Sequence, residues 1–395
     1  MQVAGSEKAS TTQLIAPTIF DDELVEYYAQ HGVTSVYGKL PVDFLGGGHE
    51  TVMLNSEINW ERLTKHIRFC RRLDIDFNYV MNSTCLGLSE FDNESRRNIF
   101  GFFDKLVEAE VTSVTVSNPN ILQMLKKEYP DVKVKVSACT YVKSVGEIKY
   151  WEELGADVVV VDPLQVNRDF KTLRGMAKFA TAELEVIVNN NCFQFCPEIY
   201  NHQNFLSHSS NQKLTASIEH DYSYNWCSKQ RLRDPAHYLI ADWIRPEDIH
   251  HYEKIGITRF KITDRNTPVE YLKKRVKAYH ERRYDGNLLD LIQHFAYRDS
   301  IAPGEYLEKV YIDNRKLDDY LKMFLKSECK PKDCGGRCRY CFDYAAEAIT
   351  VDPEFAKTNV AYKEQVNAAK NSRDEELRNR PVAFVPLVQV GGVAE

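Results

Sequence analysis

The feature that most constrains the fold is a regular alternation of short β-branched runs with amphipathic segments. Eight runs are predicted to be strands, at residues 33–37, 77–81, 111–116, 132–136, 158–161, 184–188, 238–241 and 257–262. Most segments between them carry apolar residues at helical spacing, as Leu63, Ile67 and Cys70 do. Alternating strands and helices indicate a parallel sheet. Eight such units over about 250 residues predict an α/β fold, a (β/α)8 barrel of the TIM type.

The alternation covers only part of the chain and divides it into three regions. Residues 1–20 are expected to form an N-terminal arm, and residues 21–285 the barrel. Residues 286–395 are expected to form a helical C-terminal extension with a cysteine-rich stretch. One connection inside the barrel, residues 189–237, is far longer than the others. Loops of this length in compact domains are usually functional, and in a barrel this one leaves the C-terminal face, where active sites lie.

Composition narrows the classes of protein. Hydrophobic residues make up 43% of the 395 residues and charged residues 27%, as in globular proteins. No apolar run approaches the roughly 20 residues that cross a bilayer, and the first residues do not resemble a signal peptide, so a cytoplasmic location is expected. The net charge of −6 argues against nucleic acid as a partner. A small-molecule substrate or a partner protein is expected instead.

Ten cysteines in a chain from a reducing compartment indicate metal rather than disulfides. Cys192 and Cys196 follow the strand that ends at residue 188, and Cys227 lies further along the same connection. Thiolates are preferred ligands of iron in clusters and of zinc. We therefore expect these three cysteines to bind an iron–sulfur cluster. The alternative is that they are buried structural cysteines.

A [4Fe–4S] cluster takes four ligands, and this connection offers three. Cys139 and Cys85 each follow the end of a predicted strand, on the same face of the barrel. Either could supply the fourth thiolate, or one iron could remain open for substrate. The sequence does not choose among these. Cys70, on the apolar face of a helix, is expected in the core.

A second group of cysteines lies in the extension. Cys329, Cys334, Cys338 and Cys341 fall within 13 residues. They are predicted to bind metal, either zinc in a four-cysteine site or a second iron–sulfur cluster that transfers electrons. Their inner spacing resembles the radical S-adenosylmethionine signature, but that motif follows the first strand of its barrel, and this one follows the last.

Charged residues at strand ends are candidates for substrate binding. Lys261 and Arg265 end the last strand, and their cations could hold a substrate carboxylate. The alternative for both is a surface ion pair. His202 and His208, in the long connection, are candidate acid–base groups, and the alternative is that they are simply solvated.

Two segments resemble the U32 peptidase (collagenase-like) family. One is the cysteine pair with the later Cys227-Ser-Lys-Gln-Arg-Leu-Arg-Asp-Pro, and the other is the stretch from Ile244 to Arg265, which contains Gly-Ile-Thr-Arg-Phe-Lys-Ile. The resemblance covers roughly residues 20–285. It implies a barrel, and it implies a [4Fe–4S] cluster on cysteines such as Cys192, Cys196 and Cys227, as in members that hydroxylate ubiquinone precursors or RNA bases without oxygen. One cysteine that the family shows between Cys196 and Cys227 is absent.

Three functions are therefore considered. The first is a cluster-dependent redox enzyme acting on a small molecule, with oxygen-independent hydroxylation as the implied reaction. The second is a peptidase, although the sequence shows no H-E-x-x-H and no G-x-S-x-G. The third is a non-catalytic, cluster-bearing subunit of a heterodimer, since members of the resembled family work in pairs. A homologous subunit or a ferredoxin is the expected partner.

Overall fold

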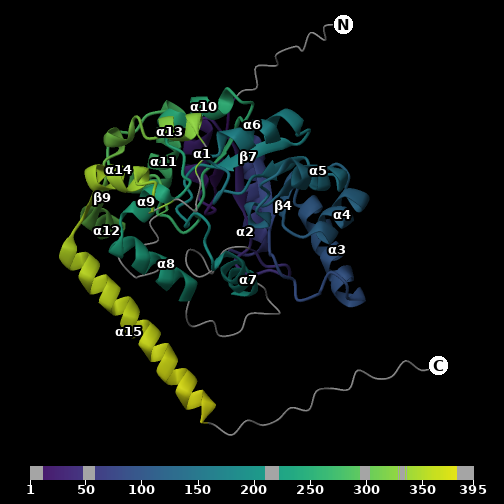
Figure 1. Cartoon of the computed structure of the whole chain (residues 1–395). Coiled ribbons are helices and arrows are strands. Elements are labelled where there is room, and N and C mark those ends of the chain that lie inside the picture. The colour runs from purple at the N-terminus through teal and green to yellow at the C-terminus, as the bar shows by residue number, and fades with distance from the viewer. Residues whose placement is uncertain are drawn as a thin grey trace.

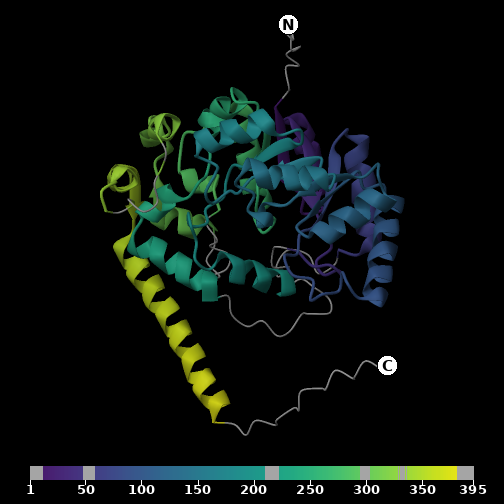
Figure 2. The same cartoon turned by 45° about the vertical axis from the view of Figure 1, so that its right-hand side comes forward.

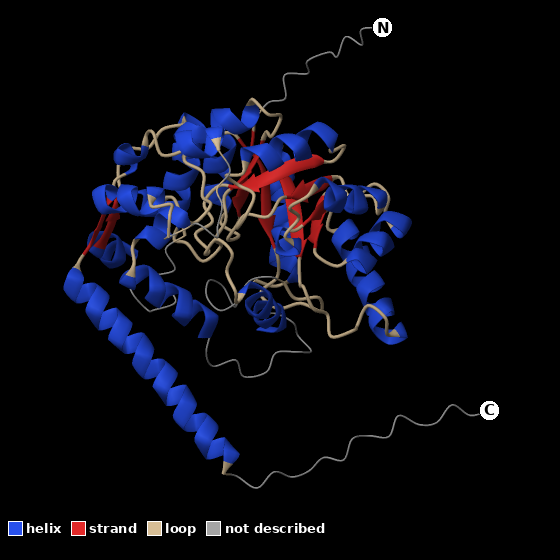
Figure 3. Cartoon of the chain, in the orientation of Figure 1, coloured by secondary structure: helices blue, strands red, loops and turns tan. Residues whose placement is uncertain are grey.

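The computed structural model describes residues 12–47, 58–209, 222–293, 303–327, 329, 334 and 336–379. Its centre is a closed barrel of eight parallel strands, arranged in sequence order with β1 paired to both β2 and β8. Helices surround this barrel, and a small two-stranded sheet and further helices pack on one side (Figures 1 and 3). The predicted (β/α)8 barrel is confirmed.

The barrel strands are short, and helices follow most of them. The strands are β1 Gln13–Pro17, β2 Val33–Gly38, β3 Asp76–Met81, β4 Ser113–Val116, β5 Lys133–Val136, β6 Val158–Val160, β7 Glu183–Ile187 and β8 Arg259–Lys261. The helices of the barrel region are α1 Asp22–Gln30, α2 Trp60–Arg72, α3 Asn93–Glu108, α4 Pro119–Glu128, α5 Val145–Glu153, α6 Phe170–Phe179, α7 Ile199–Ser209, α8 Tyr222–Arg233, α9 Ala236–Ile240, α10 Ile249–Glu253 and α11 Val269–Glu281.

Side-chain caps explain where the helices begin. Asp21, Asn59 and Asp92 each accept a hydrogen bond from a backbone N–H in the first turn of the following helix. Such caps satisfy donors that would otherwise lack partners at a helix start. At the other end, Gly155 and Gly256 adopt φ of +100° and +90° between a helix and the next strand. Most residues cannot adopt this backbone geometry without strain.

One predicted strand is wrong and one strand was missed. Residues 238–240 of the run at 238–241 belong to helix α9, where Tyr238 and Leu239 are buried in the core. The run is too short for its apolar content to distinguish a strand from a buried helical turn. The first strand, β1, lies within the predicted N-terminal arm, because its five residues give too little alternation to reveal it. Cys70 is fully buried on α2, as predicted.

The barrel interior is polar at the end away from the mouth and more apolar closer to the mouth. Lys135 and Glu185 form an ion pair of 2.6 Å there, and both side chains are buried. Burial opposes the charge of Glu185, but Lys135 and Arg259 lower the pKa of this carboxyl to about 2. Above this layer Ile15, Tyr37 and Val80 form a small apolar cluster. Side chains therefore fill the barrel below its mouth.

The extension packs beside the barrel. It contains α12 Pro303–Lys309, β9 Val310–Ile312, α13 Lys322–Lys326, α14 Tyr340–Ala348, β10 Ile349–Val351 and α15 Pro353–Arg378. β9 and β10 pair antiparallel, and the first turns of α15 pack against α8 before the helix projects from the body (Figures 1 and 2). The extension thus contacts the long connection that carries Cys227.

Among the described residues, no helix combines the length and apolarity required to cross a membrane.

Candidate functional site

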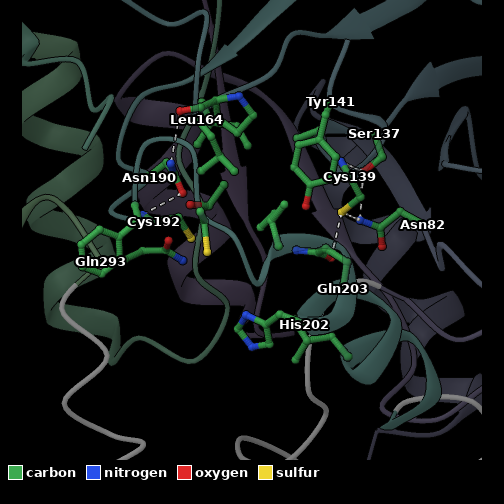
Figure 4. A pocket seen from close by; sticks show the side chains of 18 of the residues that line it. Asn82, Ser137, Cys139, Tyr141, Leu164, Asn190, Cys192, His202, Gln203 and Gln293 are labelled. Atoms are coloured by element: carbon green, nitrogen blue, oxygen red, sulfur yellow. Dashed lines mark hydrogen bonds between the residues drawn. The ribbon is translucent and has the colours of Figure 1, made fainter. Parts of the chain in front are cut away.

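A cavity of about 140 Å³ opens at the C-terminal ends of the barrel strands. The ends of β2, β3, β7 and β8 form its floor and walls, with the segment that follows β5. Helices α7 and α8, both from the long connection after β7, complete it. Figure 4 shows His202 and Gln203 of α7 at the cavity. The cavity therefore exists because this connection folds back over the barrel mouth.

Seven of the nine residues predicted for a cluster or a substrate line this one cavity. They are Cys139, Cys192, Cys196, His202, Cys227, Lys261 and Arg265. Cys85 and His208 are not among the residues that line it. The structure brings the predicted residues together, while their roles stay predictions.

Cys139 lies across the cavity from Cys192 (Figure 4). It belongs to the short 3-10 helix Ala138–Thr140 after β5. Its sulfur is 3.3 Å from Gln203 Oε1 and 3.5 Å from Asn82 Nδ2. Burial raises the pKa of the Cys139 thiol, although Ser137 and Lys261 oppose the rise. Cys139 is therefore a half-buried thiol with polar neighbours.

Arg231 ties together the two parts of the long connection that carry the other thiols. It donates from Nη1 to Cys227 Sγ at 3.5 Å and from Nη2 to the carbonyl of Asn191, next to Cys192. Its guanidinium also lies 4.7 Å from the centre of the Phe193 ring. The Cys227 S–H donates to the carbonyl of Tyr224 at 3.3 Å. A buried cation thus stands beside the thiol of Cys227 and the backbone of the Cys192 loop.

Three cations line the cavity. Within the part of the chain that the structure describes, no Asp or Glu oxygen lies within 4.0 Å of a side-chain nitrogen of Arg231, Lys261 or Arg265. The Lys261 ammonium instead lies 4.2 Å from the centre of the Tyr37 ring. Burial lowers the pKa of both Lys261 and Arg265. A cavity with this excess of positive charge is suited to an anionic ligand.

Arg231 and Gln203 line the cavity but were not predicted as site residues. Arg231 stands one helical turn after Cys227, and this i, i+4 spacing is the signal that could have revealed it. Gln203 carried no comparable signal, because only the fold of α7 over the barrel turns it towards Cys139.

The side chains do not form a preformed cage for a single ion. Among the described residues, no three His, Cys, Asp or Glu side chains are close enough together to hold one metal ion. The four cysteines of the extension lie outside the cavity lining. Of these, Cys341 is buried, Cys329 is half-buried, and Cys334 and Cys338 are exposed.

These features define a class: a (β/α)8 barrel with a cationic, thiol-lined cavity at its C-terminal face. The model of Peptidase family U32 matches residues 25–288, and the chain belongs to that family.

The chain is also similar to two known proteins. The chain is 29% identical over 316 residues to "Uncharacterized protease MJ1657" of Methanocaldococcus jannaschii, an alignment that covers 80% of this chain and 89% of that protein. Among solved structures it is similar to "The Structure of the U32 Peptidase Mk0906", with a TM-score of 0.49 and 18% identity, over 68% of this chain and 98% of that one.

Proposed function

We propose that this chain is an enzyme that binds a carboxylate-bearing small molecule in the barrel-mouth cavity and uses an iron–sulfur cluster held by Cys192, Cys196 and Cys227. One observation carries the proposal: the three thiols of the long connection line the same cavity as three cations that have no Asp or Glu oxygen within 4.0 Å among the described residues. The implied reaction is a redox reaction, with oxygen-independent hydroxylation as the specific case.

The cysteine sulfurs in the cavity are the type of ligand that an iron–sulfur cluster requires. Thiolates are the usual ligands of iron–sulfur clusters, and a cluster with its thiolates carries net negative charge. Arg231, 3.5 Å from the Cys227 sulfur, would offset part of that charge. Ligands of a cluster bind different iron atoms, so their sulfurs lie farther apart than those around one ion. The lack of a single-ion cage among the described residues is therefore compatible with this donor set.

Each remaining residue has a defined role in the proposal. Lys261 and Arg265 bind the carboxylate of the substrate, because buried cations form strong charge-assisted hydrogen bonds. His202, on α7, moves a proton at the cavity wall. Cys139 is the candidate fourth ligand of the cluster. It lies across the cavity from Cys192 (Figure 4), and this position favours contact with the substrate over binding to the cluster. When bound, the cluster would supply electrons.

Peptide hydrolysis is the second candidate, and the comparisons favour it. The family is named as a peptidase family, and the relative from Methanocaldococcus jannaschii is named as a protease. The same cations could bind the C-terminal carboxylate of a peptide. The described residues do contain one hydroxyl–imidazole–carboxylate chain, Thr18–His66–Asp22, with both hydrogen bonds at 2.7 Å. Thr18 is only 1% exposed and does not line the cavity, so substrate cannot reach it.

The test is purification of the full chain without oxygen, followed by assays of iron and acid-labile sulfide. We expect about four irons per chain in the barrel site, and loss of that iron in Cys192→Ala. The matched control is Cys85→Ala, which removes a half-buried thiol outside the cavity lining. Hydrolysis of fluorogenic peptides is measured on the same samples.

Three results would change the conclusion. Peptide hydrolysis by an iron-free chain, lost in Lys261→Met, would establish the peptidase. Full iron in Cys192→Ala would overturn the ligand assignment. Iron that dithionite cannot reduce would favour a non-catalytic, cluster-bearing subunit.

A further inference from the structure

The cysteines of the extension are not used by the proposed function, and they form a cluster of their own. Cys334 and Cys338 are paired through a backbone bridge, and Cys341 follows in the first turn of α14. Cys329 is half-buried and Cys341 is buried. Four cysteines therefore lie in one short stretch of the sequence that leads into α14.

The surroundings of this stretch suit a negatively charged thiolate site. Two cations among the described residues, Arg337 and Arg339, flank Cys338 in the sequence. Four thiolates around a divalent ion carry two excess negative charges, which nearby cations offset. Packing alone does not explain the stretch, since Cys334 and Cys338 are exposed. Exposed free thiols are prone to oxidation, so a ligand role is the better physical account.

Cys341, the buried cysteine of this stretch, has a hydrogen-bond partner that could donate to a thiolate. Cys341 Sγ lies 3.0 Å from the hydroxyl oxygen of Tyr320. The Tyr320 O–H donates to the carbonyl of Leu239 at 2.6 Å, so the Cys341 S–H is the donor to Tyr320. A deprotonated Cys341 cannot donate. The Tyr320 O–H would then turn to the sulfur, and Leu239 O would keep its hydrogen bond from Arg168 Nη2 at 3.0 Å.

We propose that Cys329, Cys334, Cys338 and Cys341 bind a thiophilic metal, as one zinc ion or one iron–sulfur cluster, with Tyr320 as the hydrogen-bond donor to the Cys341 thiolate. The described residues do not converge as they would around a bound ion. Metal-bound thiolates are held together by the metal, and their sites form when it binds. The site is separate from the barrel cavity, whose lining includes none of these cysteines.

A buried polar chain connects this metal site to the barrel-mouth loop. Arg168 donates to the Tyr320 hydroxyl at 3.0 Å and forms an ion pair with Asp242 at 3.4 Å. Gln194, between Cys192 and Cys196, donates to the same carboxylate oxygen of Asp242 at 3.2 Å. Binding of metal at Cys341 therefore acts on the chain of contacts that positions the Cys192–Cys196 loop.

The test measures metal directly. The full chain is purified without oxygen, and zinc, iron and sulfide are counted per chain in wild type, Cys334→Ser, Cys338→Ser and the control Cys85→Ser. We expect each extension variant to lose one zinc, or the iron and sulfide of one cluster, while Cys85→Ser loses none. The exposed positions of Cys334 and Cys338 allow these variants to fold, which circular dichroism checks.

Tyr320→Phe supplies an independent readout. It keeps the ring and removes the donor, and loss of an outer-shell partner typically weakens metal binding by about 10–100-fold. Competition with a chromogenic chelator measures the change. Wild-type protein without metal at this site, or Cys334→Ser and Cys338→Ser with full metal, would overturn the proposal. Cys192→Ala removes a ligand of the barrel site alone. Comparing its metal content with that of the extension variants therefore shows which of the two proposed sites binds metal.

Discussion

At the scale of single residues, the buried carboxyl group of Asp242 makes the stability of the fold depend on pH. Asp242 is 1% exposed, and its Oδ2 has no hydrogen-bond partner among the described residues. Burial raises its pKa to about 7, and Arg168 only partly opposes the rise. Burial likewise raises the pKa of Asp162 to about 6. The folded chain therefore holds protons that the unfolded chain releases.

This difference predicts how stability depends on pH. Between about pH 4 and pH 7 the unfolded chain binds fewer protons than the folded chain at these two groups, so their contribution to stability falls as pH rises. For Asp242 the upper limit is about 4 kcal/mol, since one pKa unit corresponds to about 1.4 kcal/mol. Urea unfolding from pH 4.5 to 7.5 should show a shallower decline in Asp242→Asn than in wild type. Parallel curves for the two proteins would contradict the assignment.

At the scale of elements, helix α15 packs against α8, the helix that carries Cys227. Tyr224, on α8, is buried, and the Lys363 ammonium of α15 lies 5.0 Å from the centre of its ring. Arg233 of α8 also pairs with Glu364 of α15. The first turns of α15 therefore hold in place the helix that carries Cys227 and Arg231.

A chain that ends at residue 352 tests this role of α15. Without its partner, α8 should open more often, and Cys227 in metal-free protein should react several-fold faster with iodoacetamide. Peptide mass spectrometry measures the rate at each cysteine. Cys70, fully buried on α2, is the internal control and should not change. An unchanged rate at Cys227 would show that α8 is held by the barrel alone.

At the scale of the whole molecule, stability depends on closure of the barrel between β1 and β8. Phe260 on β8 is fully buried, pairs in register with Leu14 of β1 and Val186 of β7, and packs against Tyr252. Phe260→Ala should lower the free energy of unfolding by about 3–5 kcal/mol, the usual result of a large cavity in a core. Phe179→Ala, at a side chain that is 54% exposed, is the control and should have little effect in the same urea titration. Equal losses of unfolding free energy in the two variants would mean that closure of the barrel between β1 and β8 does not determine its stability.

The sequence by itself determined the barrel and most of the residues at its mouth. Seven of the eight predicted runs are strands, because β-branched side chains packed on a curved sheet leave a readable pattern even in strands of three to six residues. Cys192, Lys261 and Arg265 could be placed at the mouth, because residues just after parallel strands share one edge of the barrel.

Tertiary structure decided the rest. The helix at residues 236–240 forms because Tyr238 and Leu239 are buried as a helical turn, and tertiary packing overrides the strand propensity of so short a run. Only the fold of the long connection shows that Arg231 bridges Cys227 and Asn191, and that Cys139 faces Cys192 across the cavity. Local patterns report which face of an element is buried. They do not report which distant element covers it, because that depends on contacts between residues far apart in the chain.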